Sequence, residues 1–201
     1  MLDIGNYKVI IKSKLSEARY NHCINVANAA VDLAIKYNAD VNKARVAGLL
    51  HDITKEMPIE EQKKLINDFN FKLDPIEEMA PKLWHAISGA IYVENILDIK
   101  DEDIIKAIKH HTTAAKNMTK LEKIIYIADF ISEERDYLGV QELRRLAYIN
   151  LDLCVLEGLK FSLIDLSKRN LLIHQDTFEA YNQMILKVNN KEVKVLDAFK
   201  V

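Results

Sequence analysis

The sequence predicts an all-α fold, a helical bundle that forms a single domain. Glycine and proline are scarce, with five and three among 201 residues, which disfavours a fold rich in tight turns. Apolar residues recur three and four positions apart, and no run shows the sustained alternation of a strand. The length is near the upper end for one compact core. We therefore assign residues 1–187 to one domain, and 188–201 to a C-terminal tail with no assigned structure.

Start signals position the helices along the chain. Ser16 is a suitable N-cap for a long helix, and Asn42 can cap the next one. Thr119 and Glu122 match a capping box. Segment 74–83 contains two prolines and is expected to be a broken connection. The predicted helices span about 16–37, 43–53, 59–69, 86–97, 101–111 and 119–132, with two or three more between 140 and 186.

The charge balance and cysteine content exclude several classes of protein. With 28 basic and 30 acidic side chains the net charge is -2, so the overall charge does not favour binding to nucleic acid or to an anionic membrane. No stretch approaches the roughly 20 apolar residues of a membrane helix, and the N-terminus does not resemble a signal peptide. Cys23 and Cys154 form no CxxC pair and no disulfide framework. We expect a cytoplasmic protein.

Histidine and aspartate side chains stand out in apolar surroundings. His51 and Asp52 end the segment RVAGLLHD, and His110 and His111 end IIKAIKHH. Asp129 lies within KIIYIADFIS, where a buried carboxylate is costly unless a positive group meets it. Any one histidine could be structural, but the group suggests a metal site. Imidazole with carboxylate suits iron, manganese, zinc, nickel or cobalt, and the lack of thiolates argues against a closed structural zinc site.

The candidate ligands come from several predicted helices, as in metal-binding bundles. His22 lies on the first, and the His51–Asp52 pair ends the second. Adjacent helical side chains diverge by about 100°, so this pair could straddle a site if Asp52 bridges two ions. Zinc-protease, Walker, GxGxxG and GxSxG motifs are absent. A thiol nucleophile at Cys23 is disfavoured because that residue lies on the apolar side of its helix.

The ordered histidines and aspartates resemble the HD-domain phosphohydrolase superfamily. RYNHCINVANAAVDLA, ARVAGLLHDITK, LWHAISGA and MTKLEKIIYIADFISEERDY resemble its bacterial YqeK subgroup, and the likeness extends over about residues 16–182. That subgroup is understood to hydrolyse diadenosine tetraphosphate symmetrically, giving two ADP. The resemblance implies an HD-domain bundle that takes a dinucleoside polyphosphate and releases a nucleoside diphosphate.

The resemblance also implies two divalent metal ions that share Asp52. One set of ligands would be His22, His51, Asp52 and Asp129. The other would be Asp52, His85 and His110. Iron is the metal most expected, with manganese, cobalt, magnesium or zinc as alternatives.

Four further residues are candidates for substrate contact or catalysis. Lys55 resembles the lysine of HDxxK segments and could hold a phosphate oxygen, or be an ordinary surface lysine. His111 could contact phosphate or protonate the leaving ADP. Thr112 could donate to phosphate or cap a helix. Arg135 could bind phosphate in a bidentate way. The alternative for Arg135 is a salt bridge to Glu133, Glu134 or Asp136.

Other positions receive a structural interpretation. For His174 we expect a structural or loop-ordering role, and for Trp84 core packing rather than stacking on a base. Two positions depart from the family pattern: Ala114 stands where glycine is frequent after HHTT, and Gln175 where proline is frequent. The first departure could alter a loop beside the substrate.

Three rival functions are left open. One is another HD-type reaction, on a nucleotide monoester or a cyclic nucleotide. The second is a nucleotide-binding regulatory module without turnover, which the complete ligand set disfavours. The third is an RNA-binding or scaffold protein, for which a basic stripe or aromatic platform is missing. Apolar C-terminal helices could support a homodimer.

Overall fold

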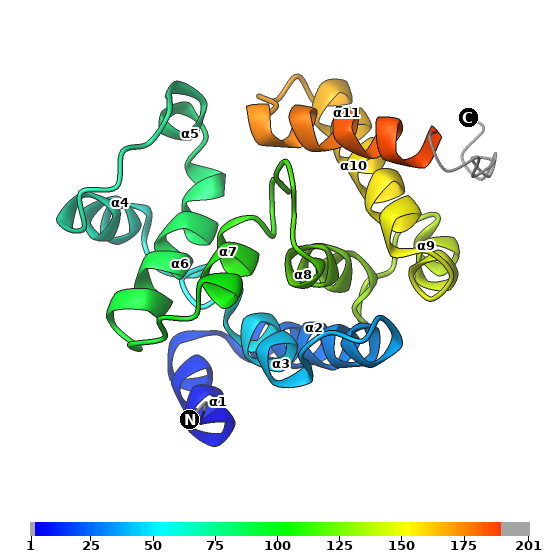
Figure 1. Cartoon of the computed structure of the whole chain (residues 1–201). Coiled ribbons are helices and arrows are strands. Elements are labelled where there is room, and N and C mark those ends of the chain that lie inside the picture. Colours follow the sequence, from blue (N-terminus) through cyan, green and yellow to red (C-terminus); the bar gives the residue numbers. More distant parts are fainter. Residues whose placement is uncertain (1–2, 190–201) are drawn as a thin grey trace.

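The computed structural model describes residues 3–189, and within this range every regular element is a helix (Figure 1). The all-helical class is therefore confirmed. The elements are α1 (Ile4–Lys14), α2 (Glu17–Lys36), α3 (Val41–Leu50), α4 (Ile59–Asp68), α5 (Pro75–Met79), the 3-10 helix η1 (Pro81–Leu83), α6 (Trp84–Asn95), α7 (Glu102–Lys109), α8 (Lys120–Ile131), α9 (Val140–Ala147), α10 (Leu151–Lys168) and α11 (Gln175–Asn189). Most of the predicted tail, 190–201, lies outside the described residues. None of the described helices is long and apolar enough to cross a membrane.

Two predicted helix starts are confirmed by their capping contacts. Ser16 Oγ accepts a hydrogen bond from the Arg19 amide at the start of α2. Thr119 and Glu122 form the reciprocal capping box of α8, with distances of 3.2 and 2.7 Å. These bonds satisfy amides that have no partner inside the helix.

Three predictions about the elements were wrong or incomplete. Helix α3 is capped by Asp40, not Asn42, because the Asp40 carboxylate accepts from two amides at 2.9 Å each. Helix α1 was not predicted, although Asp3 caps it. Segment 74–83 is not simply a broken connection. Asp74 forms a capping box there, and proline fits the first turn of a helix, where its missing amide costs no hydrogen bond.

Helix α8 is the centre of the bundle. It contacts α2, α3, α7, α9 and α10, and Figure 1 shows it end-on between α2 and α3 below and α10 above. Its middle turn, Ile124–Ala128, has no solvent exposure. A helix that is apolar on all sides must be surrounded by others, and this is why Asp129, at its end, lies close to several helices at once.

Helices α2 and α3 approach each other closely at Gly48. A Cβ atom at this position would lie 2.7 Å from the Cα of Ala27 and 3.0 Å from its backbone nitrogen. Only glycine fits between the two backbones without a shift. This contact sets how near His51, which lies three residues after Gly48 and directly follows α3, is to His22 on α2.

We therefore expect Gly48→Ala to destabilise the protein by about 1–3 kcal/mol through overpacking, and to disturb metal binding as well. Chemical denaturation measures the first effect and metal analysis the second. Gly5→Ala is the matched control, because its Cβ would meet only Asp3 Oδ1 at 3.5 Å and Gly5 is exposed. It should be neutral or stabilising by about 0.5–1 kcal/mol, as alanine favours helix. Equal stability of Gly48→Ala and wild type would contradict this view of the α2–α3 contact.

Candidate metal centre

Four histidines and two aspartates from five parts of the chain converge in the interior. We call them the metal centre. Its members are His22 on α2, His51 and Asp52 after α3, His85 on α6, His111 after α7 and Asp129 on α8. All except Asp129 are buried. Five of these six positions were among the predicted ligands, and His111 replaces His110 in the cluster.

The carboxylate of Asp52 divides the four histidines into two pairs. Its Oδ2 lies 3.7 and 3.5 Å from the Nε2 atoms of His22 and His51. Its Oδ1 lies 3.3 and 3.5 Å from those of His85 and His111. Oδ1 is buried and has no hydrogen-bond partner. A buried carboxylate oxygen without a partner is unfavourable, so this atom is well placed to bind a cation.

Three of the histidines are oriented in the same way. His51, His85 and His111 each place Nδ1 against the backbone carbonyl three residues earlier, at 2.8, 2.7 and 2.7 Å. A carbonyl can only accept a hydrogen bond, so Nδ1 carries the ring proton. The Nε2 lone pair then points into the cluster. Fixing the tautomer through the outer nitrogen is the usual way in which proteins orient metal-binding histidines.

His22 is oriented by a carboxylate instead of a carbonyl. Its Nδ1 is hydrogen-bonded to Glu134, whose second oxygen accepts from Asn25 at 2.7 Å, while Ser132 donates to the first at 2.7 Å. Burial would raise the pKa of Glu134, but the hydrogen bonds from His22, Ser132 and Asn25 outweigh it and lower the pKa to about 2. Glu134 is therefore an anion that can hold the His22 ring in place.

The inward nitrogens face one another at short range. The Nε2 atoms of His22 and His51 are 3.2 Å apart, and so are those of His85 and His111. Two lone pairs at this distance repel unless a proton or a cation lies between them. Burial, and then the neighbouring His111, lower the pKa of His85 to about 3, so this ring is neutral near pH 7 and can act as a ligand. The donor set fits divalent transition ions.

His110 and His111 exchange the places expected for them. His110 Nδ1 lies 2.7 Å from Glu122 Oε1, outside the cluster, whereas His111 is inside it. Both residues follow Lys109, the last residue of α7. Helical spacing therefore could not decide which ring turns inward. The acid role expected for His111 is hard to reconcile with this placement, because its outer nitrogen is bonded to a carbonyl.

Three basic side chains contact the metal centre. Arg19 lies 2.8 Å from Asp52 Oδ2, and Arg135 binds both the carboxylate and the backbone oxygen of Asp129. Lys55 Nζ lies 3.0 Å from His85 Nε2, so it is no ordinary surface lysine. Asp129 needs a positive partner because its surroundings are apolar. Arg135 is that partner, together with His22, whose Nε2 lies 3.2 Å from Asp129 Oδ1. The sequence suggested a salt bridge from Arg135 to Glu133, Glu134 or Asp136, but in the structure its side chain is paired with Asp129 instead.

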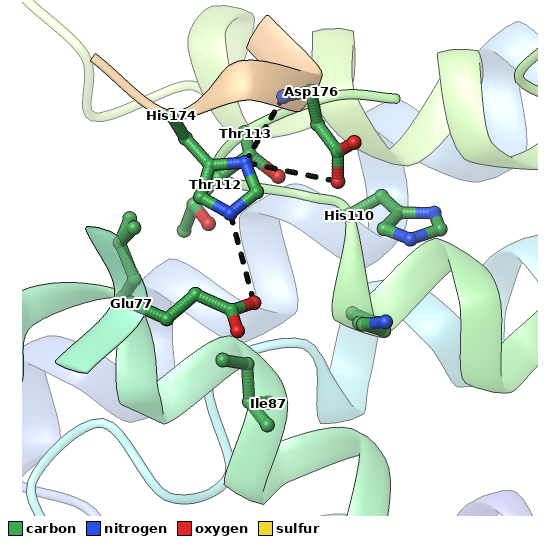
Figure 2. A pocket seen from close by; sticks show the side chains of 9 residues that line it. Glu77, Ile87, His110, Thr112, Thr113, His174 and Asp176 are labelled. Atoms are coloured by element: carbon green, nitrogen blue, oxygen red, sulfur yellow. Dashed lines mark hydrogen bonds and ion pairs between the residues drawn. The ribbon is translucent and has the colours of Figure 1, made fainter. Parts of the chain in front are cut away.

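A pocket next to His110 is lined by residues of the HHTT segment (Figure 2). Thr112 lines it, and its hydroxyl is buried without a hydrogen-bond partner, so the helix-capping alternative is not what Thr112 does. Ala114 has φ 57° and is fully buried. This left-handed conformation costs a residue with a Cβ about 1 kcal/mol, so glycine would be favoured at this position.

Two structural expectations agree with the packing. Trp84 is 7% exposed, lies in a cluster with Ile66 and Ile87, and donates its indole N–H to the Glu77 carbonyl at 2.7 Å. Cys23 is completely buried, and burial raises the pKa of its thiol strongly. Neither residue is available to a substrate in this structure.

Sequence reasoning missed Arg19 and Glu134. Arg19 lies three residues before His22 and so shares its helix face, a spacing that could have suggested a role. Glu134 follows α8 in a non-helical turn, where no periodicity tells which way a side chain points.

Comparison with known proteins gives concordant matches. The HD domain family model matches residues 19–133. A symmetrical bis(5'-nucleosyl)-tetraphosphatase of Bacillus subtilis is 38% identical, over 87% of this chain and 94% of the relative. One of Halalkalibacterium halodurans is 39% identical, over 91% and 97%. A crystal structure from Clostridium acetobutylicum, described as a predicted HD superfamily hydrolase involved in NAD metabolism, has a TM-score of 0.90, 35% identity and coverage of 93% and 99%.

The positions of the paired histidines lead to opposite expectations for two alanine variants. His111→Ala should lose bound metal, because it removes an inward nitrogen. His110→Ala should keep its metal and lose about 1–3 kcal/mol of stability, since it leaves Glu122 buried without its partner. Metal analysis after dialysis and thermal unfolding distinguish the two. Metal loss from His110→Ala alone would reverse the assignment.

Glu134→Gln should lower metal affinity by about 10- to 100-fold, the usual effect of losing a carboxylate that orients a ligand histidine. The amide oxygen can still accept the His22 proton, so the fold should be retained. Competition with a chromophoric chelator measures the affinity. Glu133→Gln is the neighbouring control, and an equal effect in both variants would exclude an orienting role for Glu134.

Proposed function

The chain belongs to the HD domain family, and on this premise we propose that it hydrolyses diadenosine tetraphosphate symmetrically to two molecules of ADP. The observation that carries the proposal is the convergence of four inward-facing imidazoles on the two oxygens of Asp52. The relatives named as symmetrical tetraphosphatases match over nearly their whole length, so the proposal does not depend on a part that this chain lacks.

We assign two divalent ions to the metal centre. His22, His51, Asp52 and Asp129 would hold one, and Asp52, His85 and His111 the other. Iron is the first candidate, with manganese, cobalt, magnesium and zinc as alternatives. Such ions, when bound, supply Lewis acidity and lower the pKa of a water molecule.

The basic side chains around the centre suit a polyphosphate substrate. Arg19 and Arg135 can each form bidentate hydrogen bonds to phosphate oxygens, and the Lys55 ammonium provides a further positive charge. In the structure the two arginines are paired with Asp52 and Asp129. A cation held at those carboxylates would weaken these pairs, so that the guanidinium groups could turn to the substrate. The unpartnered Thr112 hydroxyl can donate a further hydrogen bond.

Symmetric cleavage places the middle of the tetraphosphate over the centre. The oxygen of water adds to one of the two inner phosphorus atoms, and the bond from that atom to the central bridging oxygen breaks. One ADP leaves with the bridging oxygen, the other keeps the oxygen of water, and the two water protons pass to solvent. Because ADP is a stable polyphosphate anion, charge neutralisation by Lys55 and the arginines can support its departure without a dedicated acid.

The homodimer that the sequence leaves possible stays untested. Large apolar side chains on α10 and α11 are exposed, among them Phe161, Ile164 and Phe178 at 39, 47 and 56%.

Hydrolysis of diadenosine tetraphosphate by the metal-loaded enzyme should yield ADP alone, as resolved by anion-exchange chromatography. Asp52→Asn should lower kcat by about 100-fold or more, because it alters a ligand shared by both ions. Asp32→Asn, an exposed carboxylate on α2, is the control and should leave the rate unchanged.

ATP with AMP as products would contradict symmetric cleavage. Turnover of nucleoside monophosphates or cyclic nucleotides in preference to the tetraphosphate would indicate another HD-type reaction. Binding of ADP without hydrolysis across iron, manganese and cobalt would indicate a regulatory module.

A further inference from the structure

We propose a second cation site, separate from the metal centre, formed by Asp74, Glu77 and His174. We call it the α5–α11 site, since Asp74 precedes α5, Glu77 lies on it, and His174 directly precedes α11. The residues are up to 100 positions apart in sequence, and their ligand atoms all lie within 4.8 Å of one another. None of them belongs to the metal centre. Figure 2 shows the His174 ring between Glu77 and Asp176.

The two carboxylates are held in place by the capping box of α5. One oxygen of Asp74 accepts from the amides of Ile76 and Glu77 at 2.7 and 2.8 Å, and one oxygen of Glu77 accepts from the Asp74 amide at 2.7 Å. The remaining oxygen of each faces His174 Nε2, at 3.2 Å for Asp74 and 3.6 Å for Glu77. Ligands about 2.1 Å from a tetrahedral ion are about 3.4 Å apart, so these separations suit a common ion.

The histidine itself points to a ligand. His174 is 7% exposed, and its Nε2 atom is buried and makes no hydrogen bond. Such an atom is unfavourable unless something satisfies it. The side chains of Asp74 and Asp176 are 42 and 40% exposed, so an ion can reach the site from solvent.

The charge around His174 favours a cation. Three carboxylates face one imidazole: those of Asp74, Glu77 and Asp176, the last with an oxygen 3.7 Å from Nδ1. Lys109 lines the same pocket, but its ammonium lies over the Phe71 ring, 5.0 Å from the centroid. One imidazole with carboxylates suits a divalent transition ion such as zinc. The competing occupant is a proton on His174.

Binding a metal requires a change of tautomer. The Asp176 amide donates to Nδ1 at 3.1 Å, which places the ring proton on Nε2. Coordination through Nε2 moves this proton to Nδ1. The hydrogen bond from the Asp176 amide is then broken, and the Asp176 carboxylate can accept the Nδ1 proton as an orienting partner. The ion would then fasten α5 to the start of α11 across the pocket that contains Thr112.

Zinc ions alone are the probe, with the full-length protein and the metal centre already loaded. After equilibrium dialysis against zinc, wild type should retain one equivalent more than His174→Gln or Asp74→Asn, while Asp40→Asn should match wild type. Asparagine still caps a helix, so both Asp74→Asn and Asp40→Asn keep their helix caps. The two variants differ in whether the carboxylate that is removed faces His174. Anomalous diffraction at the zinc edge should place a peak about 2.0–2.1 Å from Nε2. Proton–nitrogen correlation spectra should show the His174 ring proton on Nδ1 only when zinc is present.

Equal zinc content in wild type and both variants, with folding verified by circular dichroism, would overturn the proposal. So would a zinc peak confined to the metal centre, or a His174 ring that carries both protons in the presence of zinc. Because the readouts count and locate an ion, they are independent of whether diadenosine tetraphosphate is the substrate.

Discussion

In each of the four histidines of the metal centre, the position of the ring proton determines whether the inward nitrogen can bind a cation. In His51, His85 and His111 a backbone carbonyl fixes that proton on the outer nitrogen, and Glu134 does the same for His22. Four lone pairs are thereby aimed into a small buried space. Helix packing then brings them together in pairs on either side of one carboxylate. Such an arrangement is unfavourable by itself, because facing lone pairs repel and a buried carboxylate oxygen lacks a partner. It becomes favourable when positive charge is present.

The packing has to be close and rigid for this geometry to hold. Helix α8 is enclosed on all sides, so Asp129 cannot move without disturbing several helices. The contact at Gly48 sets the spacing of α2 and α3, and with it the distance between His22 and His51. Protein interiors are packed about as densely as organic crystals and transmit small displacements. The core therefore acts as the frame on which the ligand distances depend.

The sequence predicted the helical class and the main helices because apolar periodicity and capping residues are local signals. It also predicted, partly from apolar context and partly from family resemblance, that Asp129, the His51–Asp52 pair and His85 share one metal site, and the structure brings these side chains together. What it could not resolve depends on orientation outside regular helix. His110 and His111 follow the end of α7, and Glu134 follows the end of α8, so no period fixes where they point. Helix α5 was missed because Pro75 and Pro81 together suggested a break, although Pro75 occupies a favourable first-turn position of α5 and Pro81 begins the 3-10 helix η1.

The pairing of Arg19 with Asp52 and of Arg135 with Asp129 bears on the order of events during maturation. Each carboxylate already has a guanidinium as counter-ion, so the chain does not need a metal to neutralise its interior while it folds. Folding and metallation can then occur as separate steps, unlike in small zinc domains that are unfolded without their ion.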